Sequence, residues 1–324
     1  MPTRLFTLAL LPLLACAHPR AAGPATEAGP APGSTADGGP LAGPPTDAGP
    51  LAGPPAEGGL VVPLQPYAGR LVTVQVELKG ETMPFLLDTS GGLTVLTPET
   101  AQRLGCAGPP VVAFRSDGGK VALPRCGLVA LSIAGQRFES EAAVFDLKQV
   151  LPGGLPPVGG VIGLGTLEAR PFTLELAARR LTFESEGSLA ARARDATPLG
   201  VRLQRSVMGM ALDLFVAVRG RGGPLWFELD STNLGDVVVS RQALAALAIP
   251  DAQGQALAAG GQGTIDLHVE GLGALPVRAV AGDLIYDGAF SVHAVEGLAL
   301  TFDLRNARVW ARRAAPAKAD AADL

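Results

Sequence analysis

The chain has 324 residues, of which 48% are hydrophobic, and carries a formal net charge of −4. This composition excludes a disordered acidic protein. It also excludes a nucleic-acid-binding protein, because no stripe of basic residues is present to neutralise phosphates. The three histidines and three cysteines have no spacing typical of a zinc site, so we expect neither a metal nor a cofactor.

The N-terminus is predicted to be a targeting segment. Arg4 precedes an apolar run, residues 5–15, that is too short to span a bilayer in the mature protein. The run ends in Ala15-Cys16, which resembles the lipobox of bacterial lipoprotein signal peptides. This implies removal of residues 1–15, a lipid on Cys16 and export to the cell envelope, at the periplasmic side of the outer membrane in a Gram-negative source. An ordinary signal peptide cut nearby is the alternative.

A disordered linker is predicted over residues 16–60, because they are mostly Pro, Gly and Ala and offer little to bury. Within it PLAGPPTDAG (40–49) is followed at once by PLAGPPAEGG (50–59). Such a segment is an extended, semi-stiff tether. The tail, 314–324, has a similar composition and is predicted to be disordered too.

The roughly 250 residues between them favour a mainly β fold with a few short helices. Short apolar runs alternate with period two, and turn residues interrupt them every eight to twelve positions. One helix is well marked: Thr97 is suited to the N-cap, Pro98 and Glu99 to the first turn, and Gly105 to the end.

An internal repeat indicates two lobes. PFLLDTSGGLTVLTPETAQRL (84–104) resembles LWFELDSTNLGDVVVSRQALAAL (225–247), which aligns Asp88 with Asp230 and predicts a capped helix in both copies. FTLELAARRLTF (172–183) resembles LTFDLRNARVWA (300–311) in the same way. The offset is 142 residues at the aspartates (230 − 88) and 128 at the end segments (300 − 172), so the second copy is shorter in its middle. We expect lobes at 61–190 and 191–313.

Two aspartates from two such copies can activate a water. When two carboxyls lie close enough to share a proton, one pKa rises and the other falls, which provides an acid and a base. One carboxylate then deprotonates the water while the other protonates a peptide carbonyl. A single copy cannot do this, so Asp88 and Asp230 are expected to meet.

These segments resemble the retropepsin-like and pepsin-like aspartic proteases. The likeness is clearest around FLLDTSGG (85–92) and GGVIGLG (159–165) and covers about residues 65–313. It implies a two-lobed barrel fold in a single, monomeric chain that acts on a peptide or protein substrate. Asp88 and Asp230 would be the catalytic pair, and Thr89 and Ser231 would lock the two loops together.

The resemblance also implies a flap that closes over the substrate. VVAFRSDGGKVALPRC (111–126) is predicted to be a hairpin with its turn at Ser116, Asp117, Gly118 and Gly119, and Phe114 is expected to cover part of the site. Cys106 and Cys126 are either a disulfide, which would fasten the base of this hairpin, or two buried free thiols.

The sequence departs from the family at the residue two positions after each aspartate. The family has Gly there, whereas this chain has Ser90 and Thr232. An active endopeptidase and an impaired pseudo-peptidase, which binds a peptide or a cell-envelope partner without cleaving it, are therefore both consistent with the sequence. A structural envelope module without groove chemistry is the third alternative.

Overall fold

The computed structural model describes residues 58–247 and 249–314. The predicted signal peptide, Cys16, the linker up to residue 57 and the tail from residue 315 lie outside the described residues. In the described ranges no helix is both long and apolar enough to cross a bilayer.

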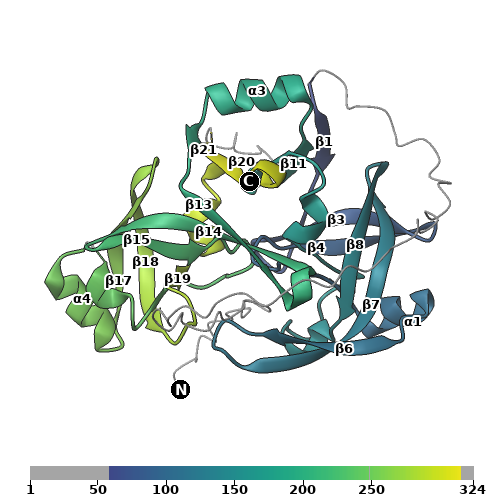
Figure 1. The fold of residues 1–324 in the computed structure, drawn as a ribbon, viewed down its shortest axis with the longest axis horizontal. Helices are drawn as coiled ribbons and strands as arrows, with labels where there is room; N and C mark the ends of the chain where they lie inside the picture. The colour runs from purple at the N-terminus through teal and green to yellow at the C-terminus, as the bar shows by residue number, and fades with distance from the viewer. Residues whose placement is uncertain (1–57, 248, 315–324) are drawn as a thin grey trace, which may run out of the picture.

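The described chain forms two β lobes joined by a third sheet (Figure 1). The first lobe is an eight-stranded sheet with the order β2-β3-β4-β9-β5-β8-β7-β6, and an additional β3–β7 pairing curls it into a barrel-like unit. Its strands are β2 (Gln65–Tyr67), β3 (Leu71–Leu78), β4 (Glu81–Leu87), β5 (Thr94–Leu96), β6 (Gly108–Phe114), β7 (Lys120–Ile133), β8 (Gln136–Val144) and β9 (Gly160–Ile162).

The second lobe repeats this arrangement without a counterpart of the β6–β7 hairpin. Its order is β13-β14-β15-β19-β16-β18-β17, and a β14–β17 pairing curls it in the same way. The strands are β13 (Val201–Ser206), β14 (Ala211–Gly220), β15 (Gly223–Glu228), β16 (Val237–Ser240), β17 (Gln262–Val269), β18 (Gly273–Gly282) and β19 (Gly288–Ala289).

A six-stranded sheet lies between the lobes, with the order β1-β11-β10-β20-β21-β12. Its strands are β1 (Leu60–Pro63), β10 (Phe172–Glu175), β11 (Arg180–Phe183), β12 (Thr197–Pro198), β20 (Leu298–Asp303) and β21 (Arg308–Arg313). Thr173 and Thr301, which differ by the repeat offset of 128, pair with each other where β10 meets β20, and their hydroxyls are 2.9 Å apart. An approximate two-fold axis therefore passes through this pair.

Helices are short and few in the described chain: α1 (Pro98–Leu104), α2 (Leu164–Leu167), α3 (Glu186–Arg194), α4 (Asp251–Ala258), α5 (Val292–Val295) and the 3-10 turns η1 (Leu147–Gln149), η2 (Val207–Gly209), η3 (Leu244–Ala246) and η4 (Leu304–Asn306). Helix α1 begins and ends as predicted, with the Thr97 side chain accepting the Thr100 N–H and Gly105 left-handed. Helix α3 spans the predicted lobe boundary at 190/191.

The helix predicted in the second copy after Ser240 is wrong. Residues 241–247 form turns and the short η3. Two contacts compete with an α-helix here: Leu247 forms a β-bridge to Gly220, and its carbonyl accepts a hydrogen bond from Arg221. These contacts hold Leu247 against the β14–β15 turn, so its backbone groups find hydrogen-bond partners without forming a helix.

Candidate active site

Each lobe places its aspartate at the end of a central strand. Asp88 follows β4, and its N–H donates to Ile162 O in the neighbouring parallel strand β9 at 3.1 Å. Asp230 follows β15, which pairs in parallel with β19 in the same way. The sequence around β19 differs from its counterpart in the first lobe, yet the strand takes the corresponding place. The two aspartates are thus held by equivalent frameworks.

Reciprocal hydrogen bonds join the two aspartate loops. The Thr89 N–H donates to Ser231 Oγ at 3.1 Å, and the Ser231 N–H donates to Thr89 Oγ1 at 3.0 Å. Each hydroxyl also donates to a carbonyl of the opposite lobe: Thr89 Oγ1 to Leu229 O at 2.7 Å and Ser231 Oγ to Leu87 O at 3.5 Å. All of these groups are buried, so they are strongly held in register.

Ser90 and Thr232 serve as hydrogen-bond donors to the aspartates. The N–H and the hydroxyl of Ser90 both donate to Asp88 Oδ1 at 2.8 Å. The N–H of Thr232 donates to Asp230 Oδ1 at 2.8 Å, its hydroxyl donates at 2.9 Å, and the Asn233 N–H adds a third bond at 2.9 Å. Neither Ser90 nor Thr232 has a positive φ, so glycine is not needed at these positions.

In the first loop the residue that must be glycine is Gly91, which follows Ser90. A Cβ on Gly91 would come within 2.9 Å of Asp88 Oδ2. The carbonyl of Gly91 in turn packs against Gly163, where a Cβ would collide with it. Gly91 and Gly163 therefore let the first loop approach its aspartate and the β9–α2 turn closely.

Burial raises the pKa of both aspartates. Desolvation, followed by the charge of Asp88, raises the pKa of Asp230 to about 7. Desolvation also raises the pKa of Asp88, and the hydrogen bonds from Ser90 oppose this shift. The Thr232 hydroxyl lowers the pKa of Asp88 as well, and the Ser90 hydroxyl lowers that of Asp230, so each hydroxyl lies near the opposite aspartate. The two carboxyls are therefore neighbours that titrate as a pair.

The predicted flap hairpin is β6–β7, and its turn touches the second lobe. Asp117 accepts the Gly119 N–H at 2.7 Å, which shapes the turn, and Gly118 is left-handed. Ser116 is almost fully buried, and its carbonyl accepts the Ile285 N–H at 2.9 Å. Phe114 is half-buried with the Lys120 ammonium 5.9 Å from its ring centroid. The tip of this hairpin is thus bonded to the second lobe.

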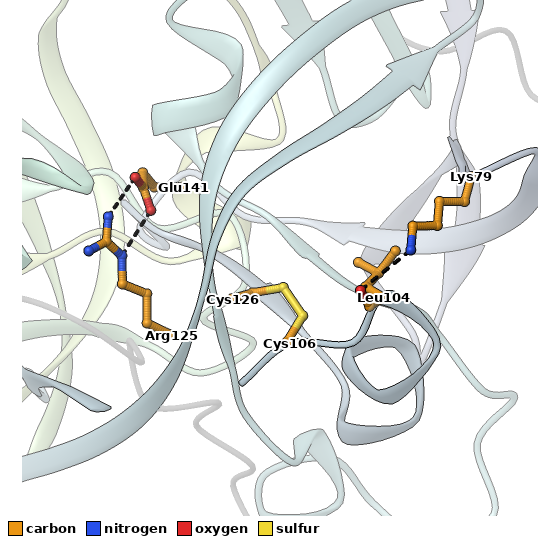
Figure 2. The surroundings of a disulfide bond; sticks show 6 residues. All are labelled: Lys79, Leu104, Cys106, Arg125, Cys126 and Glu141. Atoms are coloured by element: carbon orange, nitrogen blue, oxygen red, sulfur yellow. Dashed lines mark hydrogen bonds and ion pairs between the residues drawn. A yellow bond between two sulfur atoms is a disulfide. The ribbon is translucent and has the colours of Figure 1, made fainter. Parts of the chain in front are cut away.

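Cys106 and Cys126 form a disulfide at the base of the flap (Figure 2). Cys106 follows α1 and precedes β6, whereas Cys126 lies at an irregularity of β7. Beside it, Arg125 makes a bidentate ion pair with Glu141 on β8, with contacts of 2.7 and 3.1 Å (Figure 2). The bond therefore links the two strands of the hairpin to the body of the first lobe.

Three residues near the aspartates were missed by sequence reasoning: Asp213, Glu228 and Tyr286. The first two are fully buried in the β14–β15 hairpin, and the Tyr286 hydroxyl donates to Glu228 Oε2. Acidic residues inside the otherwise apolar runs LDLFVAV (212–218) and LWFEL (225–229) were the available signal. In the described part of the chain, no group of three His, Cys, Asp or Glu residues is arranged to hold a metal ion.

Comparisons with known proteins agree with this architecture. The aspartyl protease family model matches residues 74–165, which contain Asp88 and most of the first lobe. No curated protein matches the chain in sequence.

Two seed proteins are similar in structure. Basic 7S globulin from soybean aligns with a TM-score of 0.50 at 13% identity, over 82% of this chain and 99% of its own. Conglutin gamma, a basic 7S globulin from lupine seeds, aligns with a TM-score of 0.48 at 15% identity, over 80% of this chain and 95% of its own. The soybean protein has the pepsin-like fold, so the predicted two-lobed aspartic-protease fold is confirmed. Identities this low concern the fold alone.

Proposed function

We propose that the chain is an aspartic-type endopeptidase in which Asp88 and Asp230 activate a water. The observation that carries the proposal is the reciprocal bonding of Thr89 and Ser231, which brings two equivalent aspartate loops together. A structural acidic turn would need neither this link nor a second copy of itself. The aspartyl protease match of residues 74–165 supports the same reaction class.

The electrostatics assign different roles to the two carboxyls. Asp230, with a pKa of about 7, keeps its proton at mildly acid pH and is the general acid for the peptide carbonyl. Burial alone raises the pKa of Asp88, whereas the charge of Asp88 adds to the effect of burial at Asp230. In this proposal Asp88 is therefore the group that ionises first and is the general base for the water. Asp230 Oδ2 has no hydrogen-bond partner among the described residues, so it can present that proton.

The alternative is a pseudo-peptidase that binds a peptide without cleaving it. One observation favours it: Asp230 is fully buried and the flap tip is bonded to the second lobe. In the active-enzyme proposal this arrangement is a closed state that opens to admit substrate. In the alternative it is a clamp around a bound segment.

Export and lipid anchoring remain part of the proposal. The Cys106–Cys126 disulfide fits an oxidising compartment. Replacement of Cys16 by Ser is expected to move the protein from the membrane fraction to the soluble fraction, and to abolish labelling by a radioactive fatty acid. Labelling that is unchanged by Cys16→Ser would exclude the lipobox interpretation.

The test of the endopeptidase is cleavage of a broad peptide library between pH 4 and 6. Wild type is expected to cut a defined set of bonds, and Asp88→Asn is expected to cut none of them. Cleavage of the same bonds by Asp88→Asn would reject Asp88 as the base. Binding without cleavage by the wild type would favour the pseudo-peptidase.

A further inference from the structure

The second lobe contains two buried acids that its fold does not require. In the first lobe, β3 and β4 pair Thr73 with Leu86, and in the second lobe β14 and β15 pair Phe215 with Glu228. The offset of 142 that relates the aspartates also relates these pairs, so Glu228 stands where the first lobe has Leu86. By the same offset, Asp213 stands where the first lobe has Leu71.

Both leucines are buried core residues. Apolar side chains therefore satisfy this position of the fold in the first lobe. Two acids at the equivalent places in the second lobe bury carboxyls that cost free energy unless a partner compensates them. We call Asp213 and Glu228 the second acid pair.

The second acid pair lies on the same sheet face as Asp230. Glu228 is the last residue of β15, and Asp230 lies two residues beyond it, so in extended chain their side chains point to the same side. The bond from Leu229 N–H to Leu214 O at 3.1 Å continues the hairpin register beyond β15, which brings Asp213 opposite Asp230. Side chains opposite one another in such a ladder have Cβ atoms roughly 5 Å apart.

Contacts with the first lobe place the second acid pair at the seam between the two lobes. A Cβ on Gly92, in the Asp88 loop, would collide with Asp213 Oδ1. Glu228 accepts a hydrogen bond from the Tyr286 hydroxyl, and the N–H of the neighbouring Ile285 donates to the Ser116 carbonyl at the tip of the β6–β7 hairpin. The pair thus lies between the tip of the β6–β7 hairpin and the aspartates.

Several polar atoms here have no partner in the described chain. Both carboxylate oxygens of Asp213 and Oε1 of Glu228 are buried without a hydrogen bond. The same holds for the hydroxyls of Ser206 and Ser116. Ser206 lies beside Asp213, where it lowers the pKa of that acid, and Ser116 lies beside Tyr286. These two hydroxyls therefore border the second acid pair and Tyr286.

We propose that the second acid pair is a subsite for an organic cation of the peptide, the ammonium or guanidinium group of a Lys or Arg side chain or of a free N-terminus. Such a group carries several N–H donors and a positive charge, and it matches the unpartnered carboxylate oxygens in both respects. An apolar residue would leave those oxygens unpaired, so it binds less tightly. The proposal rests on the proposed peptide-binding groove and specifies what the groove selects.

Binding of the cation should release protons. Desolvation raises the pKa of Asp213 to about 7 and that of Glu228 well above its usual range, so both acids are protonated at mildly acid pH. A cation stabilises their ionised forms, and each proton lost goes to the buffer. A purely structural pair would keep its protons when a peptide binds.

The experiment uses the full chain carrying Asp88→Asn, so that bound peptide stays intact. N-acetylated peptides with one Lys moved along the sequence are compared by calorimetry with the same peptides bearing norleucine, in two buffers of different ionisation heat. At one position, Lys is expected to bind at least tenfold more tightly and to release protons. In a second series, free N-terminal amines replace the acetyl groups. If tighter binding appears in that series alone, the bound cation is the N-terminal ammonium and not a side chain.

The matched variants follow from the first lobe. Asp213→Leu with Glu228→Leu installs the leucines of the equivalent positions and should reduce the preference below twofold, without proton release. Asp266→Leu, an exposed acid on β17, should leave the preference unchanged. If the double leucine variant does not fold, Asp213→Asn with Glu228→Gln keeps the shape of the pair and should have the same effect.

The outcomes separate this inference from the endopeptidase itself. The subsite is overturned, even if wild type cleaves peptides, if Lys and norleucine bind equally at every position and a free N-terminal amine gives no gain over the acetylated peptide. A preference that survives both double variants overturns it as well. A preference that depends on the pair supports the subsite even if wild type cleaves none. Failure to bind any peptide overturns the groove and the subsite together.

Discussion

Asp213 should make the protein less stable as the pH rises, and Asp213→Asn should remove the part of that dependence that Asp213 causes. Asp213 is completely buried, and no ion pair with it is found among the described residues. Desolvation therefore raises its pKa from 3.8 to about 7. Because the pKa is higher in the folded state, the folded protein binds the proton more tightly than the unfolded chain. The stabilisation is complete below pH 3.8 and is lost as the pH rises through 7.

The magnitude follows from the shift. Each pKa unit corresponds to about 1.4 kcal/mol, so the change from 3.8 to about 7 corresponds to about 4 kcal/mol between pH 4 and pH 7. Asn keeps the shape of the side chain and cannot ionise. The free energy of unfolding of the Asp213→Asn variant should therefore fall less over this range, by about 4 kcal/mol, than that of wild type.

Urea denaturation at pH 4, 5, 6 and 7 measures this difference, and the exposed Asp266→Asn is the control. Parallel pH dependence in wild type and Asp213→Asn would refute the reasoning, because it would mean that Asp213 is ionised in the folded protein. A weaker pH dependence of the free energy of unfolding in Asp266→Asn, without one in Asp213→Asn, would refute it as well.

Three other tests, each with its own variants, address separate parts of the protein. Thr89→Val removes a hydroxyl that links the lobes and leaves buried groups unpaired, so the free energy of unfolding should fall by about 1–3 kcal/mol and cleavage should be lost. Ser231→Ala should act in the same way. Normal stability of both variants would contradict the link between the lobes. Cys106→Ser with Cys126→Ser should cost about 3 kcal/mol, as expected for a 20-residue separation, and an unchanged melting temperature in oxidised protein would argue against the bond. Ser90→Ala removes a hydrogen bond that lowers the pKa of Asp88, so the acid limb of the pH–activity profile should move to higher pH. An acid limb at the same or a lower pH would contradict that role of Ser90.

The sequence was sufficient for residues whose neighbours are local or repeated. Thr97 and Gly105 mark a helix by short-range chemistry, and they begin and end it in the structure. Asp88 and Asp230 were paired because the same apolar strand precedes each of them. The fold follows from that repeat, since two equivalent copies bury equivalent faces.

Residues defined by strand register or by contacts between lobes were not predictable in the same way. Asp213 faces Asp230 only because the β14–β15 hairpin has one particular register, which the spacing of the two residues does not reveal. Tyr286 reaches Glu228 because the second lobe joins β18 to β19 through only residues 283–287. The repeat predicts a capped helix after Ser240, and tertiary contacts of this segment override that expectation.

The importance of Ser90 and Thr232 also changed with the structure. Their departure from the family's glycine leaves both an active and an impaired site consistent with the sequence. In the fold their backbone is ordinary and their hydroxyls donate to Asp88 and Asp230. The close approach occurs at Gly91 instead, which the sequence could not distinguish from its neighbour.

The most direct test of the central claim is kcat/KM for one peptide that the wild type cleaves, measured at pH 5 for wild type, Asp88→Asn, Asp230→Asn and the surface control Asp266→Asn. Loss of either member of the pair should lower kcat/KM by about 10²–10⁴-fold, as expected when general acid or base catalysis is removed. The control should match wild type. Activity in Asp230→Asn within a few-fold of wild type, with Asp88→Asn inactive, would contradict a shared pair and indicate a site built on one aspartate.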